Sequence, residues 1–134
     1  VLPSMMTALA ERAAALSGPA FPLLSPAIGV LGAFISGSNT VSNVLFASFQ
    51  FQTAAFLGLS PLLMVTLQVV GGAIGNMVCV NNVVAVCATV GIANAEGLLI
   101  RRNALPCAVY AACAAALVTV LIYAGADPIA FGPP

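Results

Sequence analysis

Two clusters of uncharged polar residues interrupt a long apolar stretch of this chain. The first covers residues 36–43 and the second covers residues 75–82, and no charged residue occurs from Ala13 to Ala95. An amide or hydroxyl group without a partner in hydrocarbon is costly, so these side chains need partners. The candidates for binding an ion or a substrate are Ser38, Asn39, Thr40 and Asn43 in the first cluster and Gly75, Asn76, Asn81 and Asn82 in the second.

These residue types favour the binding of a small anion or a cation. If the clusters interrupt helices, the free N–H groups of a half-helix can hold a carboxylate, while unwound carbonyl groups and side-chain oxygens can hold a cation. A sodium site built from oxygens of Ser38, Asn39, Thr40 and Asn76 is one such arrangement. Two simpler interpretations stay open. The first cluster also fits an aqueous turn with ordinary capping bonds, and the second also fits close helix packing.

The composition indicates an integral membrane protein. The 134 residues are 62% hydrophobic and 4% charged, and the mean hydropathy is +1.16, whereas a soluble domain carries about 25% charged residues. This excludes a soluble enzyme and a disordered chain, and the three basic residues are too few to neutralise nucleic-acid phosphates. With no histidine, and with cysteines that lack metal-ligand spacing, the sequence predicts neither a metal site nor a cofactor.

The polar clusters also divide the apolar sequence into membrane elements, each crossing needing about 20 helical residues. We expect an all-α integral membrane fold with a re-entrant helical hairpin at 20–59 whose tip is 36–43, a discontinuous transmembrane helix at 60–96 broken at 75–82, and a continuous transmembrane helix at 104–124. Ser60-Pro61 and Asn103 with Pro106 are typical helix starts. Two interruptions near the middle of a crossing can meet and form a site at the bilayer centre.

The arginines predict the orientation. Arg101 and Arg102 lie in the expected loop at 97–103, so the positive-inside rule places that loop in the cytoplasm. The hairpin and the broken helix would then enter from outside. Residues 1–19 are expected to be the end of a preceding segment or an external loop, and residues 125–134 an external tail. Because the chain starts at Val1 without an initiator Met, we expect a piece of a longer protein.

Residues 21–26, 32–46 and 71–86 resemble the L-lactate permease family, most specifically in the Gly-Ser-Asn-Thr segment at 37–40. The resemblance covers nearly all of residues 20–124. It implies the C-terminal portion of a bacterial transporter that carries L-lactate, and often D-lactate and glycolate, into the cell with protons. It also implies that Ser38, Asn39 and Thr40 form a hairpin tip at the substrate and cation site, beside a helix break that runs from Asn76 to Asn82.

Taken together, the residues and the resemblance predict part of a secondary active transporter that imports L-lactate or a related 2-hydroxy monocarboxylate by proton symport. Its expected location is the bacterial plasma membrane. The expected partners are the monocarboxylate, the coupling proton, the lipid bilayer and the remainder of the permease. Apart from two cysteines, no side chain between Ala13 and Ala95 titrates near neutral pH, so the proton carrier is expected elsewhere in the protein.

Two other functions are left open by the sequence. One is a sodium-coupled transporter of another small organic anion, and the other is a non-transporting helical scaffold subunit. An enzyme is not expected, because the chain has no His and no Lys, and no carboxylate lies near its serines to act as a base.

Overall fold

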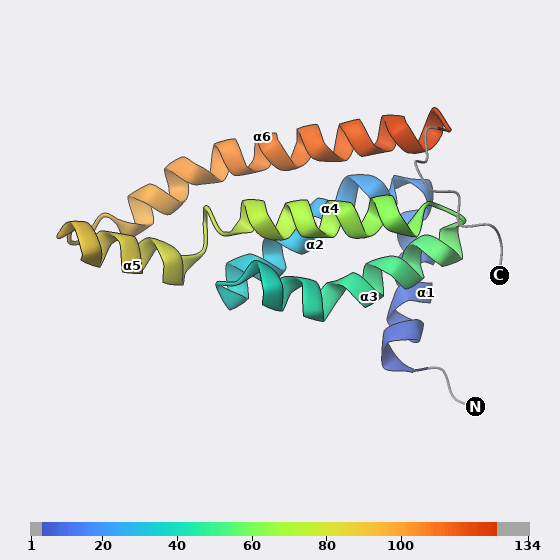
Figure 1. Cartoon of the computed structure of the whole chain (residues 1–134), viewed down its shortest axis with the longest axis horizontal. Helices are drawn as coiled ribbons and strands as arrows, with labels where there is room; N and C mark the ends of the chain where they lie inside the picture. Colours follow the sequence, from blue (N-terminus) through green and yellow to red (C-terminus); the bar gives the residue numbers. More distant parts are fainter. Residues whose placement is uncertain (1–3, 126–134) are drawn as a thin grey trace.

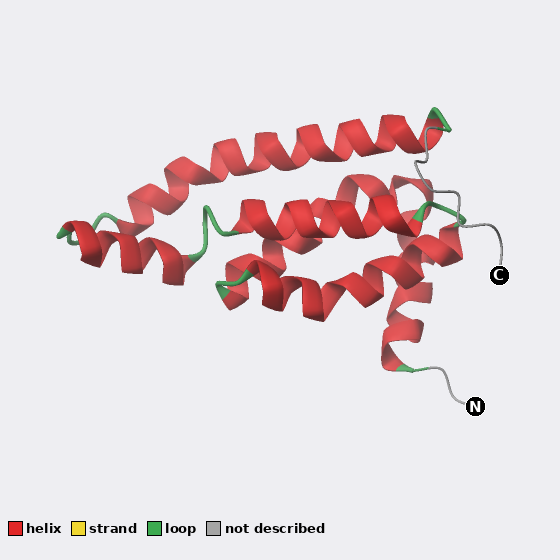
Figure 2. Cartoon of the chain, viewed as in Figure 1, coloured by secondary structure: helices red, strands yellow, loops and turns green. Residues whose placement is uncertain are grey.

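A computed structural model describes residues 4–125, and every regular element in that range is helical (Figure 2). The elements follow in the order α1 (Met5–Ser17), the short 3-10 helix η1 (Gly18–Ala20), α2 (Phe21–Ser36), α3 (Asn39–Leu57), α4 (Pro61–Gly75), α5 (Val80–Val90) and α6 (Glu96–Tyr123). This agrees with the expected all-α fold.

Helix α4 is the centre of the molecule. It packs against α2 and α3 on one side and against α6 on another, and α2 and α3 also pack against each other. Figure 1 shows α6 running along the length of the molecule, with α4 and α5 end to end beside it. The turn between α2 and α3 lies near the connection between α4 and α5. The short helix α1 runs across this direction and contacts α3.

Glycines allow α2 and α4 to lie unusually close together. A methyl group at Gly71 would collide with the carbonyl group of Pro26, and a methyl group at Gly29 would lie 2.5 Å from the carbonyl oxygen of Gln68. Gly75 faces Val30 of α2 in the same way, at 2.5 Å from its carbonyl oxygen. In a membrane, moving a side chain from lipid into a helix contact supplies little driving force for helix association. Small residues let the helices approach closely and gain van der Waals packing instead.

Helices α2 and α3 are joined by a tight connection at Gly37 and Ser38, so the expected tip at 36–43 was too wide and residues 39–43 are helical. Gly37 ends α2 in the left-handed conformation, with φ of 75°, which glycine adopts without steric cost. Whether this hairpin is re-entrant in a bilayer stays a prediction.

The expected interruption of the next helix is also present, and it is narrower than predicted. Helix α4 ends at Gly75 and α5 begins at Val80, so the break is Asn76–Cys79 rather than 75–82. Ser60 caps α4 as expected: its hydroxyl accepts a hydrogen bond from the N–H group of Leu63 at 3.5 Å. Asn81 and Asn82 belong to the first turn of α5.

The predicted start of the last helix was wrong. Helix α6 begins at Glu96, so residues 97–103 are helical and Asn103 is an interior residue instead of a cap. Pro106 likewise lies inside the helix. Ile100 packs against the buried cluster of Ile74, Val78 and Cys107. Glu96 in the first turn interacts favourably with the helix dipole. The expected tail at 125–134 lies outside the described residues, apart from Gly125.

Three segments of the described chain are long and apolar enough to cross a membrane: Met5–Ser36, Pro61–Val90 and Glu96–Tyr123. The broken helix therefore has the length of one crossing when α4 and α5 are counted together, and α6 alone has the length of another. Most of α6 is exposed in this chain, since only 17% of its most apolar window is buried.

Candidate functional site

The two polar clusters meet in space. A methyl group built on Gly37, at the hairpin tip, would lie 3.2 Å from the amide nitrogen of Asn81 and 3.4 Å from the sulfur of Cys79. At the first residue of α3, Asn39 Oδ1 lies against Gly72 of α4, where a side chain would collide with it. The tip of the α2–α3 hairpin therefore packs directly on the break between α4 and α5.

Four helix ends converge at this point. The N-termini of α3 and α5 and the C-termini of α2 and α4 all belong to the tip or to the break. Ser38 caps α3, its hydroxyl accepting from the N–H group of Val41 at 3.3 Å. The N-cap of α5 is Cys79, which makes no side-chain cap. The first-turn N–H groups of α5 are thus available to a ligand, and a helix N-terminus favours an anion.

The asparagines of the break face two different sides. Asn81 lies toward the hairpin tip, as described above. Asn76 and Asn82 bond to each other, with Asn82 Nδ2 donating to Asn76 Oδ1 at 3.3 Å, and both line a cavity of about 250 Å³ next to Leu99 and Asn103 of α6. The residues of the second predicted cluster therefore lie on two sides of the break, and of its three asparagines only Asn81 lies against the hairpin tip.

Two of the predicted site residues have plain structural explanations. Gly75 is buried against Val30 and Ala33 of α2, so its lack of a side chain serves helix packing. Thr40 is exposed in the first turn of α3.

Helix α6 approaches the break through Asn103, whose amide donates to the carbonyl oxygen of Met77 at 3.1 Å. At about 1.5 Å per residue, Asn103 lies about 10 Å from the start of α6 and about 30 Å from its end. The break is therefore closer to the end that carries Arg101 and Arg102 than to the other end. Along α6 the interruption is therefore not central. Within Pro61–Val90, the helix along which the expectation counted residues, it lies near the middle, between the 15 residues of α4 and the 11 of α5.

Sequence reasoning missed a buried hydrogen-bond network behind the tip. Ser25, Ser42, Gln50 and Gln68 are each 0% exposed and lie where α2, α3 and α4 meet. Gln50 Nε2 donates to Gln68 Oε1 at 3.1 Å, and Gln68 Nε2 donates to Ser42 Oγ at 3.0 Å. The signal for this network was present in the sequence, because Gln68 is the single amide side chain of α4 and Gln50 interrupts an apolar part of α3.

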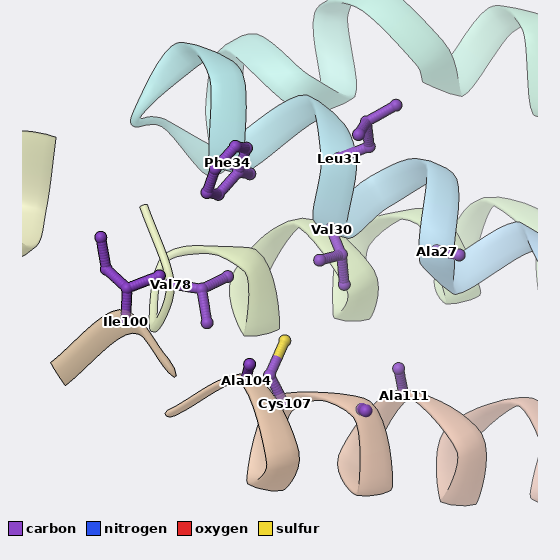
Figure 3. Close-up of a pocket in the computed structure, with 10 residues that line it drawn as sticks. Ala27, Val30, Leu31, Phe34, Val78, Ile100, Ala104, Cys107 and Ala111 are labelled. Carbon is purple, nitrogen blue, oxygen red and sulfur yellow. The ribbon is translucent and has the colours of Figure 1, made fainter. Parts of the chain in front are cut away.

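A second cavity, of about 400 Å³, lies between α2 and α6. Figure 3 shows Val30, Leu31 and Phe34 of α2 on one side and Ile100 and Ala104 of α6 on the other. Its lining is almost entirely hydrocarbon, so it offers no donor set for a carboxylate. The polar tip–break junction is the better candidate for a binding site.

Comparison with known proteins identifies the family. The sequence profile described as L-lactate permease matches residues 2–124. The chain belongs to the L-lactate permease family. A Haemophilus influenzae protein provisionally named as an L-lactate permease is 45% identical over 112 residues, which are 84% of this chain and 21% of that protein.

Two relatives from Escherichia coli extend this comparison. Its L-lactate permease is 41% identical over 85 residues, and its glycolate permease is 39% identical over 85 residues. Each alignment covers 63% of this chain and 15% of the relative. This permease-family chain therefore spans about one fifth or less of the length of these relatives. No solved structure matches it significantly.

Family membership confirms the resemblance noted from the sequence. Permeases are transporters and not enzymes, so the expectation that the chain is not an enzyme is confirmed as well. Together with the three segments able to cross a membrane, the family identifies a multi-pass membrane protein. The roles of the individual site residues remain predictions.

Proposed function

We propose that this chain is part of a secondary active transporter that imports L-lactate or a related 2-hydroxy monocarboxylate. The observation that carries the proposal is the contact between Gly37 at the hairpin tip and Asn81 at the start of α5, which brings two helix N-termini to one place. The relatives named for lactate and for glycolate support a small hydroxy acid as the substrate.

The proposed site binds the substrate carboxylate without a formal positive charge. Free N–H groups in the first turns of α3 and α5 and the amides of Asn39 and Asn81 supply donors, and the two helix dipoles favour an anion. Hydrogen bonds to a charged group are stronger than those between neutral groups. At the C-terminal ends of α2 and α4, the carbonyl oxygens of Ala33, Ile74 and Gly75 accept main-chain hydrogen bonds. The other terminal carbonyl groups are offered in this proposal to a cation or to the substrate hydroxyl.

Proton symport across the bacterial plasma membrane is the coupling that we propose, with a re-entrant α2–α3 hairpin facing the substrate. The tip–break junction contains amides, hydroxyls and Cys79 but no carboxylate or histidine. The proton carrier in this proposal therefore belongs to the remainder of the permease.

The test uses a chimeric permease, in which this chain replaces the matching stretch of the Escherichia coli L-lactate permease, expressed in cells that lack lactate uptake. We expect Asn39→Ala and Asn81→Ala each to lower the uptake of labelled lactate about tenfold at low substrate concentration, because each removes a donor to a charged group. Gln52→Ala is the matched control. This amide is on the same helix as Asn39, but among the described residues it bonds only to Ser48, at 3.2 Å.

Several results would contradict the proposal. Unchanged uptake by both asparagine variants at equal membrane expression would favour the scaffold function. Uptake that requires sodium and survives collapse of the proton gradient would favour sodium coupling. Uptake that is not competed by glycolate or other 2-hydroxy acids would contradict the substrate class.

A further inference from the structure

The buried amides behind the tip form a chain with a single direction. Gln50 Nε2 donates to the carbonyl oxygen of Ser25 at 3.0 Å and to Gln68 Oε1 at 3.1 Å. Gln68 Nε2 shares its two hydrogens among three acceptors, of which Asn43 Oδ1 is the most distant, at 3.5 Å. Asn43 Nδ2 donates to Asn39 Oδ1 at 3.2 Å. From Gln50 through Gln68 and Asn43, each amide nitrogen donates to the oxygen of the next amide toward the tip, and Asn39 is the last acceptor.

We propose that Gln68, held in place by Gln50, is a positioning residue that determines which end of the Asn39 amide faces the substrate. This inference rests on the proposed function, in which Asn39 binds the carboxylate. Gln68 itself is fully buried, so we assign it a positioning role and not a binding role. Its effect passes through Asn43.

Two main-chain carbonyl groups fix the direction of the chain. A carbonyl oxygen can only accept, so the end of Gln50 that faces the Ser25 carbonyl must be its NH₂ group. The carbonyl oxygen of Ser42 lies 3.3 Å from Gln68 Nε2, so the end of Gln68 that faces it must also be an NH₂ group. Turning either amide around would place two acceptors against each other.

The hydroxyl of Ser42 reinforces this orientation. It donates to the carbonyl oxygen of Gly29 at 2.9 Å, which uses its only proton. Toward Gln68 the same oxygen can therefore only accept, as it does at 3.0 Å. The NH₂ group of Gln68 is thus surrounded by acceptors on α3.

The outcome at the tip is a donor group on the partly buried side chain of Asn39. Because Asn39 Oδ1 is occupied by Asn43 and packed against Gly72, the NH₂ group of Asn39 is the end left toward the junction. Within residues 4–125 this group donates to no other residue. A donor at this position attracts an anion, whereas the reversed amide would present an oxygen and repel one.

The network also has a cost that packing alone does not explain. Gln50 Oε1 is buried and finds no donor among the described residues. A buried acceptor without a donor lowers stability relative to a hydrocarbon side chain of similar shape. We infer that the network is kept despite this loss of stability because it orients Gln68, Asn43 and Asn39.

The test is a double-mutant cycle on lactate transport by the chimeric permease. Gln68→Met keeps the side-chain volume but removes both hydrogen-bonding groups, and Gln50→Leu, measured in parallel, removes the donor that holds Gln68 Oε1. We expect each to raise the KM for lactate about tenfold with little change in maximal rate or membrane expression, because the loss affects binding. Thr66→Val is the control, since this exposed hydroxyl on α4 bonds only to the carbonyl of Leu62.

The same substitutions are then made in an Asn39→Ala background, where we expect less than a twofold further change in KM. If KM rises as much in that background as in the parent, the positioning role is overturned while the binding site stands. If the parent KM is unchanged by Gln68→Met and Gln50→Leu, or only the amount of protein falls, the role is also overturned. If Asn39→Ala alone leaves KM unchanged, the proposed site fails, and this inference fails with it.

Discussion

Single residues at the hairpin tip combine a backbone requirement with a contact. Gly37 has φ of 75° and also lies against Asn81 and Cys79, so a side chain there would be strained and would push on the break. Gly91, which ends α5, has nearly the same φ of 71° but has no atom within 4 Å of the position a methyl group would take. A substitution at Gly91 therefore tests backbone strain alone, whereas a substitution at Gly37 tests backbone strain together with the contact at the junction.

We expect Gly37→Ala to reduce lactate uptake by the chimeric permease at least tenfold, and Gly91→Ala to leave it within about twofold. Both substitutions impose a similar backbone cost of about 1–2 kcal/mol, but only the first displaces the start of α5. Uptake assays at matched membrane expression give the comparison. Equal losses in both variants would mean that backbone strain, and not the tip–break contact, controls activity.

At the scale of the elements, the close packing of α2 against α4 holds the α2–α3 hairpin in place. Gly71 and Gly75 of α4 face the main chain of Pro26 and Val30 on α2, and the buried glutamine network lies in the same three-helix region. The tip is therefore placed by contacts spread along the whole length of α2, and its own short connection contributes only the turn.

Gly71→Ala should lower the stability of the protein by about 2 kcal/mol or more, because its methyl group would meet the Pro26 carbonyl and overpacking of a close contact is costly. Gly97→Ala is the control: its added methyl group meets nothing within 4 Å, and alanine is the better helix former. Thermal unfolding in detergent measures both. A Gly71→Ala protein as stable as the parent would show that the two helices can separate freely.

At the scale of the whole molecule, the charged residues between positions 4 and 125 lie on two helices, α1 and α6. Glu96, Arg101 and Arg102 lie on the first turns of α6, and Glu11 with Arg12 lies on α1. The tip–break junction is nearer to the arginine end, since Asn103 contacts Met77. The large exposed apolar surface of α6 suits lipid or the remainder of the permease.

The positive-inside rule then gives a prediction for sidedness. In a variant of the chimeric permease with the native cysteines replaced by serine, Arg102→Cys should react with a membrane-impermeant maleimide only from the cytoplasmic side. Ala124→Cys, an exposed residue just beyond the other end of α6, should react only from outside. The opposite pattern would reverse the orientation of the chain, and labelling of both from one side would contradict α6 as a membrane crossing.

The sequence alone determined the chemical class of the protein and the approximate positions of the hairpin tip and the helix break. These features are local. Nearly complete absence of charge requires a lipid environment, and polar or glycine-rich residues within an apolar run interrupt a helix wherever the fold places it. The Ser60-Pro61 start of α4 was predictable for the same reason, because a cap depends on a few neighbouring residues.

Only the tertiary structure decided which polar groups meet. Gln68 and Ser42 are 26 positions apart and Asn103 and Met77 are also 26 apart, so neither contact follows from local pattern. Asn81 and Asn82 are adjacent in sequence, yet one lies at the hairpin tip and the other faces α6, because successive helical residues point about 100° apart. Helix α6 began earlier than predicted because its first turns pack against α5 and the break, which stabilises a helix that local capping signals alone would start later.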